Sequence, residues 1–182
     1  KIVDEGLSDL AEVRFSDYRD VTESDFDAVS SIGLTEHIGV HNYPAYFTFI
    51  RDKLRVGGMM LNHCITRPDN FKNARAGSFI DRYVFPNGKL PSAREIATVV
   101  EGRFIIEDWH NFGADYDRTL MAWWENFERA WPTLEARYGK RFYRMWKYYL
   151  MCCAGFFRSR EGQLWQVMLT HPQRQDMYRS LR

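Results

Sequence analysis

The sequence has few cysteines, almost no net charge and no long apolar run. Its 182 residues include three cysteines, Cys64, Cys152 and Cys153, without any Cys-x-x-Cys spacing. An odd set of this kind excludes a disulfide framework and indicates reduced thiols in a cytoplasmic protein. The formal net charge of +1 gives no electrostatic reason to expect nucleic-acid binding. No apolar stretch approaches the roughly twenty residues that a membrane-spanning helix needs.

Converging metal ligands are also missing. His63 and Cys64 are adjacent, and neighbouring residues of a strand point to opposite faces of the sheet. We therefore predict no metal site.

Strand and helix patterns alternate along the chain, which predicts one α/β domain with a parallel sheet covered by helices. Strands are expected at residues 12–15, 26–32, 56–63, 103–108 and 163–170. Helices are expected at residues 42–54, 92–100, 115–130 and 140–157. Ser92 and Glu95 form a capping-box pattern at the start of the second helix.

The most informative stretch is EDWHNFGADYDRTLMAWW, residues 107–124. It predicts a strand, a glycine turn and a helix that opens with Asp115, Tyr116 and Asp117. Ligands of open α/β sheets bind where strands end and helices begin. Tyr116 is therefore the first candidate site residue, while the two aspartates suit a helix start.

Large side chains crowd the late helices, among them Trp123, Trp124, Phe127, Trp131 and Trp146. Stripes of this kind usually form core contacts. The alternative is that a few of them line an apolar tunnel for a long hydrocarbon.

Several motifs resemble the cyclopropane-fatty-acyl-phospholipid synthases, which are S-adenosylmethionine-dependent methyltransferases. The resemblance rests on FDAVSSIGLTEHIG (26–39), LNHCIT (61–66), YVFPNGKLPS (83–92), residues 107–124, YYLMCCAGFFRSR (148–160) and QLWQV (163–167). It implies a Rossmann-like class I methyltransferase sheet with strand order 3-2-1-4-5-7-6 and aromatic-rich late helices.

The Gly-rich loop that follows the first strand of such a sheet has no counterpart before Phe26, and the chain opens with Lys1. The resemblance therefore predicts that residues 1–182 form the C-terminal part of a methyltransferase domain whose first two strands lie outside this sequence. We expect such a fragment to bind S-adenosylmethionine weakly and to be inactive alone.

The resemblance implies methyl transfer from S-adenosylmethionine to the cis double bond of a phospholipid acyl chain, with proton loss to a bound bicarbonate that closes a cyclopropane ring. By resemblance, bicarbonate is held by Glu36, His63, the backbone amide of Ile65 and Tyr116, of which the three side chains are catalytic. Cofactor contacts are expected from Asp17, Tyr18, Ser31, Ile32 and Gly33. Without the resemblance, Glu36 would be a helix-start carboxylate and His63 a strand-end histidine.

The implied partner is an unsaturated phospholipid, reached by peripheral contact with the inner face of the membrane, and a homodimer is also open. Basic residues of a long connection are candidates for headgroup contact: Arg67, Lys72, Arg75, Arg82 and Lys89. The alternative is an ordinary solvated loop, which the basic content of this connection favours.

Two alternatives stay open. A related methyltransferase could leave a methyl or methylene branch or methylate an amine, and a noncatalytic lipid-binding or interaction module would need no chemistry.

Overall fold

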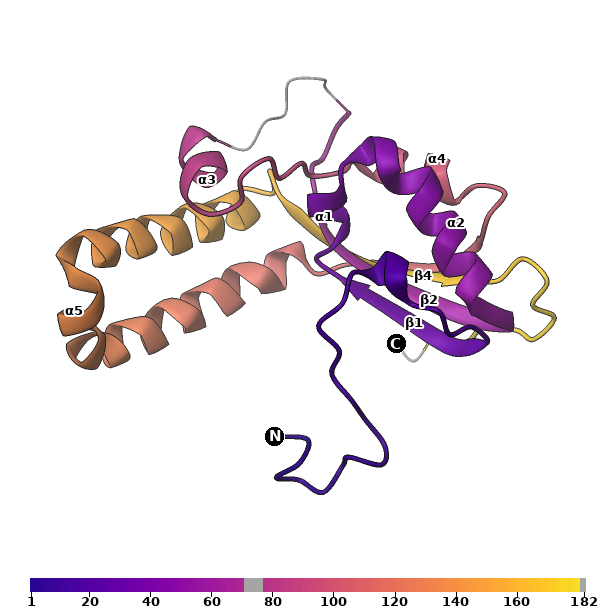
Figure 1. Cartoon of the computed structure of the whole chain (residues 1–182). Helices are drawn as coiled ribbons and strands as arrows, with labels where there is room; N and C mark the ends of the chain where they lie inside the picture. Colours follow the sequence, from indigo (N-terminus) through magenta and orange to yellow (C-terminus); the bar gives the residue numbers. More distant parts are fainter. Residues whose placement is uncertain (71–76, 181–182) are drawn as a thin grey trace.

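The computed structural model describes residues 1–70 and 77–180 (Figure 1). Its four-stranded sheet has the order β1-β2-β4-β3. The strands are β1 (Phe26–Ile32), β2 (Leu54–Thr66), β3 (Ile105–Asn111) and β4 (Gln163–Thr170). The helices are α1 (Thr35–Ile38), α2 (Tyr43–Lys53), α3 (Ser78–Tyr83), α4 (Ala93–Val100) and α5 (Gly113–Arg158), with short 3-10 turns at Tyr18–Asp20 and Val40–Asn42.

The sheet is mixed, which corrects the expectation of a parallel one. β1 and β2 are parallel, but β4 runs antiparallel to both of its neighbours, β2 and β3. β1, β2 and β3 therefore point the same way, and their carboxyl ends share one edge. Alternation of strands and helices misses the reversal of β4, because α5 folds back on itself and returns the chain to the edge that it left.

The main core lies between one face of the sheet and helices α2 and α4. Tyr43, Tyr46 and Phe47 of α2 are almost fully buried there against Met60 and Cys64 of β2. Burial alternates along β2, as the two faces of a strand require. The predicted capping box is confirmed: the Ser92 side chain accepts from the Glu95 amide, and the Glu95 side chain accepts from the Ser92 amide.

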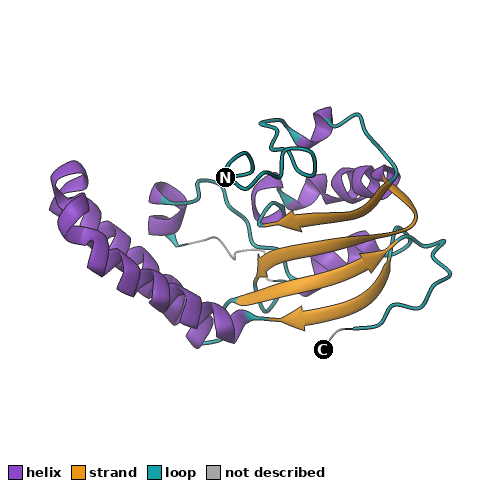
Figure 2. Ribbon diagram, turned by 90° about the horizontal axis from the view of Figure 1, so that it is seen from below, coloured by secondary structure: helices purple, strands orange, loops and turns teal. Residues whose placement is uncertain are grey.

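The opposite face of the sheet is open. In Figure 2 the strands lie in front of α2 and α4, and no helix of the described chain covers the face toward the viewer at β1 and β2. Ile32 at the end of β1 is 68% exposed. The outer edge of β1 pairs with no other strand of the described residues.

The N-terminal segment is extended but is not a strand. Residues 12–15, predicted as a strand, make no ladder with any described strand, and Val13 and Phe15 are exposed. A short β pattern forms a strand only when a neighbour supplies hydrogen bonds.

Helix α5 is a long hairpin that projects beyond the sheet (Figure 1). The prediction of two helices over this region is confirmed: they meet at a kink at Gly139, where φ is 72° and ψ is 163°. The first of them is longer than predicted, because helical turns also occupy residues 131–138. Asp117 near its start accepts two hydrogen bonds from the Arg158 guanidinium at its end, at 2.9 and 3.0 Å. Leu120, Leu150 and Phe157 form a second core at the base of the hairpin.

Candidate active site

The carboxyl ends of β1, β2 and β3 bring the predicted residues to one edge of the sheet. Ile32 is paired with His63, His63 with Gln166 of β4, and Gln166 with His110 of β3. The Gly33 amide extends this row by donating to the His63 carbonyl at 2.9 Å. The expected convergence of three strand ends is confirmed.

Glu36 crosses from α1 to the end of β2. Its Oε1 accepts a hydrogen bond from the Ile65 amide at 2.7 Å, and its Oε2 accepts from the Thr35 hydroxyl at 3.2 Å. Tyr43 fixes this turn because its hydroxyl donates to the Thr35 carbonyl at 2.7 Å. Glu36 is only 6% exposed, so the carboxylate is held in place rather than solvated. The Ile65 amide, predicted to bind an anion directly, donates its hydrogen bond to Glu36 in the structure.

His63 is half-buried beside this carboxylate. Burial lowers the pKa of its imidazole, and Glu36 opposes that shift with its negative charge. Its Nδ1 lies 3.2 Å from the side-chain nitrogen of Gln166. The lowered pKa favours a neutral imidazole, whose Nδ1 is in contact with Gln166 and whose Nε2 has no such contact with it.

Tyr116 enters from the first turns of α5. Its ring packs edge-on against Phe157 at 4.9 Å between centroids, and Tyr116 and Ile65 border the same apolar cluster. Burial raises the pKa of the Tyr116 phenol, with smaller contributions from Cys153 and Glu36. The phenol stays protonated at neutral pH and can donate a hydrogen bond.

The side chains around Tyr116 are apolar or are titratable groups that keep their proton. Burial raises the pKa of Cys153 to about 11 and that of Tyr149 to about 12. Neither group carries charge near pH 7, so Glu36 supplies the nearby negative charge. A buried carboxylate beside neutral donors can bind a small polar ion and share its protons.

The sequence profile described as mycolic acid cyclopropane synthetase matches residues 1–167. The chain belongs to this family.

Relatives and solved structures agree with the assignment. The chain is similar to the cyclopropane-fatty-acyl-phospholipid synthase of Escherichia coli K12, with 48% identity over 158 residues, 87% of this chain and 41% of the relative. It is also 48% identical over 171 residues to a protein of Mycobacterium tuberculosis named "Probable fatty acid methyltransferase", covering 93% of this chain and 40% of that one. This chain thus spans about two fifths of these curated relatives.

A solved structure of the mycolic acid cyclopropane synthase CmaA1, complexed with SAH and CTAB, matches with a TM-score of 0.75 at 27% identity over 84% of this chain and 57% of that chain. The fold is accordingly that of the class I methyltransferases. The observed order β1-β2-β4-β3 corresponds to the last four positions, 4-5-7-6, of the order that the resemblance implied.

The residues expected to contact the cofactor differ in how far their side chains are already bonded within the protein. The side chain of Ser31 faces α2, where its oxygen accepts from the Tyr46 hydroxyl at 2.6 Å. Tyr18 packs edge-on against Tyr46, and Asp17 accepts hydrogen bonds from Arg19. Ser31 and Tyr18 are therefore engaged within the fold, whereas Asp17 is exposed and has only this local contact. Gly33 has a φ of +69°, and the position where its side chain would stand is open space.

Two residues of the site escaped prediction. Gln166 contacts His63, and Thr35 contacts Glu36. Neither residue type signals chemistry by itself, and the antiparallel pairing that brings Gln166 to His63 is not visible in the sequence.

The structure describes three of the five basic residues proposed for headgroup contact. Arg67 is only 6% exposed and pairs with Glu95 at 2.7 Å, so the prediction is wrong for this residue. Lys72 and Arg75 lie outside the described residues. Arg82 and Lys89 are exposed, and the backbone amide of Lys89 donates to the Glu36 carbonyl.

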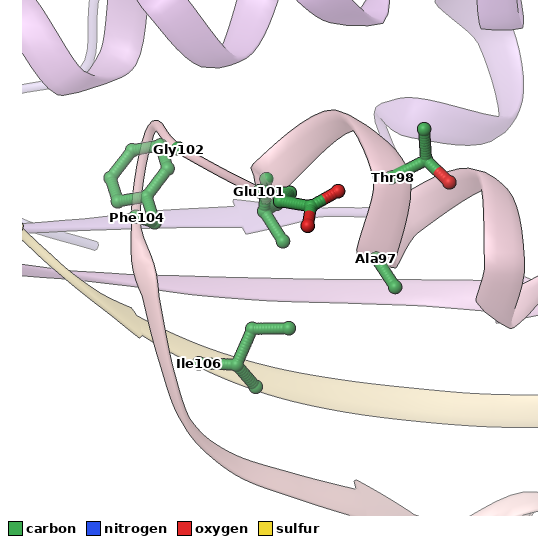
Figure 3. Close-up of a pocket in the computed structure, with 7 residues that line it drawn as sticks. Ala97, Thr98, Glu101, Gly102, Phe104 and Ile106 are labelled. Atoms are coloured by element: carbon green, nitrogen blue, oxygen red, sulfur yellow. The ribbon is translucent and has the colours of Figure 1, made fainter.

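A hollow elsewhere on the surface contains none of the predicted site residues. Figure 3 shows a shallow hollow at the C-terminal end of α4, lined by residues that include Glu101, Phe104 and Ile106. Ile106 belongs to the amino-terminal half of β3, and no predicted site residue lines this hollow. Within residues 1–70 and 77–180, no group of three potential metal ligands converges. No helix among the same residues is long and apolar enough to cross a membrane.

Proposed function

We propose that the protein of which this chain is a part transfers a methyl group from S-adenosylmethionine to the cis double bond of an unsaturated phospholipid acyl chain and forms a cyclopropane ring. Membership of the cyclopropane synthetase family supports the reaction class. The observation that carries the site assignment is the Glu36 carboxylate, bound to the Ile65 amide beside His63 at the converging strand ends.

S-adenosylmethionine, when bound, supplies a sulfonium methyl group that the electron pair of an alkene can attack. The open space at Gly33, beside the exposed Ile32, fits the approach of a ligand to the backbone at the end of β1. Tyr18 and Ser31 have a supporting role in this proposal, since both contact Tyr46 of α2 and so connect the segment before β1 and the end of β1 to that helix. Asp17 is exposed and stays a candidate for direct contact with the cofactor.

Ring closure requires a base, because a C–H bond of the added methyl group must break while its electron pair closes the ring. We infer that the base is a bicarbonate ion held by His63 and Tyr116 as donors and by Glu36 as an acceptor for the bicarbonate hydroxyl. Glu36 then orients the ion through that shared proton. The Ile65 amide contributes by fixing Glu36, and it reaches the ion only by sharing its hydrogen between two acceptors.

A site that handles a developing cation must also exclude water and present electron-rich groups. The ring of Tyr116 and its neighbours Trp123 and Phe157 provide π density close to the candidate residues. The raised pKa of Tyr116 agrees with a weakly solvated location.

The unpaired edge of β1 and the open face of the sheet support a proposal that further strands complete the methyltransferase domain. A parallel strand with an unpaired edge leaves backbone donors and acceptors to bind another strand. Residues 1–182 alone should therefore bind S-adenosylmethionine weakly. Micromolar binding to these residues, measured by calorimetry, would contradict this part of the proposal.

The decisive assay supplies the complete protein with unsaturated phospholipid vesicles and S-adenosylmethionine, with and without bicarbonate. We expect Glu36→Gln and Tyr116→Phe to lower turnover by about 100-fold, the lower range for groups that position a proton acceptor, with little change in vesicle binding. Asp115→Asn and Tyr138→Phe are matched controls on the exposed surface of α5 and should retain turnover.

Mass spectrometry of the lipids identifies the product. A gain of CH2 that resists mild hydrogenation indicates a ring, whereas a saturated methyl branch or a methylated amine indicates another methyltransferase of this fold. Full activity of both site variants would show that the site is misassigned. Lipid binding without methyl transfer by the wild-type protein would favour the noncatalytic alternative.

We also propose that α5 contributes to peripheral contact with anionic lipid on the cytoplasmic side of the membrane. Residues 137–158 contain six basic residues and no acidic one. Five of the six are exposed and not paired as Arg158 is with Asp117: Arg137, Lys140, Arg141, Arg144 and Lys147. Each such charge contributes about 1 kcal/mol at an anionic bilayer surface.

Vesicle sedimentation separates this proposal from a purely structural hairpin. Arg141→Ala combined with Arg144→Ala should reduce binding to phosphatidylglycerol vesicles by at least tenfold, as expected from the loss of about 2 kcal/mol. Arg118→Ala on the other half of α5 is the control. Equal binding by all three proteins would refute the role of these charges.

A further inference from the structure

Gln166 is the residue of β4 that lies directly opposite His63 in the antiparallel pair of β2 and β4. Side chains of directly paired residues project from the same face of a sheet. The side-chain nitrogen of Gln166 accordingly lies 3.2 Å from Nδ1 of His63. This contact joins a candidate site residue to a strand from which the sequence predicted no site residue.

The direction of this hydrogen bond determines where the histidine carries its proton. An amide NH2 group donates and does not accept, so the facing Nδ1 must be the unprotonated ring nitrogen. Burial lowers the pKa of His63, and a neutral imidazole has a single N–H. That N–H is then on Nε2, the ring nitrogen directed away from Gln166.

This tautomer suits the environment of the ring. Glu36 acts on His63 with negative charge, and its carboxylate is fixed within the same strand-end cluster by the Ile65 amide. The Nε2–H tautomer leaves a donor on the ring nitrogen that Gln166 does not contact. The other tautomer would place two donors against each other at Gln166.

We propose that Gln166 is a positioning residue that holds neutral His63 as its Nε2–H tautomer, so that the ring donates a hydrogen bond to the anion bound at the strand ends. The inference rests on the proposed function for the identity of that anion. It adds a residue and a specific protonation state to the site, and its main test needs no catalytic activity.

The two tautomers are distinguished by nitrogen NMR of protein labelled with 15N-histidine. The chain has five histidines, and His63→Asn identifies the signals of His63 by their loss. We expect the wild-type ring to have a protonated Nε2 and an unprotonated Nδ1 near pH 7.5. A protonated Nδ1 in the wild-type protein would overturn the inference.

Substitutions at position 166 test whether Gln166 is the cause. In Gln166→Glu the side chain keeps its size but only accepts, so we expect protonation of Nδ1 and a higher imidazole pKa. In Gln166→Leu the preference is lost, and both tautomers should be populated. Gln163→Glu is the control, because Gln163 lies on the same strand and accepts from Trp165 instead. An unchanged His63 tautomer in both position-166 variants would equally overturn the inference.

Kinetics add a readout that a merely structural role would not change. Gln166→Glu should lower kcat on the order of 10- to 100-fold, the usual cost of losing a group that orients a functional histidine, while the KM for lipid stays near the wild-type value. Its pH–rate profile should shift with the pKa of His63. If the tautomer is as expected but the wild-type protein transfers no methyl group, the proposed function fails and the assignment of Gln166 stands.

Discussion

Arg67 provides the strongest stability prediction, because its guanidinium lies in a buried network between the end of β2 and the start of α4. It donates to the Leu90 carbonyl at 2.9 Å, to Asn70 at 3.1 Å and to Glu95 at 2.7 Å. Arg67→Ala removes all three bonds and leaves Glu95 without its cation.

The expected cost follows from these contacts. Removing one partner of a buried ion pair costs about 3–5 kcal/mol. Glu95 is 17% exposed at its side chain and still accepts from the Ser92 amide at 2.8 Å, so the lower end applies, about 3 kcal/mol. For a protein of this size, that corresponds to a fall in Tm of about 6–12 °C.

Urea denaturation and calorimetry of Arg67→Ala measure this loss, with Arg94→Ala as the matched control. Arg94 is an exposed arginine of α4, the helix that contains Glu95. Its removal should change the free energy of unfolding by less than about 0.5 kcal/mol. A loss below about 1 kcal/mol for Arg67→Ala would refute the reasoning. Folded Arg67→Ala should also keep wild-type vesicle binding, because the side chain is not available to headgroups.

Three further predictions concern the core and the site. Tyr46→Phe should lower stability by about 1–2 kcal/mol in urea denaturation, since it leaves the buried Ser31 oxygen without its donor. At pH 8 a thiol reagent should modify the exposed Cys152 but reach Cys64 only after unfolding, because burial raises the pKa of Cys64 to about 12; rapid labelling of Cys64 in the native protein would contradict this. The lowered pKa of His63 favours the folded state above the unfolded-state value near 6.5 and loses that effect as pH falls. His63→Asn should therefore lose less stability than the wild-type protein between pH 7.5 and 5; equal losses would argue against burial as the cause.

Local sequence patterns predicted the positions of several elements. The strand β1, the helical spacing in α2 and the capping box of α4 all appear where the sequence indicates them, although most side chains of β1 are exposed. Each of these signals depends on neighbouring residues along the chain. Residues 12–15 have a strand pattern but no pairing neighbour among the described strands, so they stay extended.

Features that depend on distant partners were harder to predict. Glu36, His63 and Tyr116 were identified through the family resemblance, and the sheet brings their elements to one edge. Arg67 was assigned to the surface because the sequence does not reveal that it pairs with Glu95, 28 positions away along the chain. Gln166 was missed for the same reason, since its meaning comes from the register of β4.

That register gives insertions and deletions very different consequences along the chain. At the Gly139 break the chain turns in an exposed tip, where an added residue would lengthen a loop and leave both strands attached to α5 in place. One residue added between Gly162 and Gln166 would instead bring a neighbour of Gln166 opposite His63 and reverse the faces of β4. Natural variation in length should therefore accumulate at the tip of the hairpin and be absent from the four residues that precede Val167.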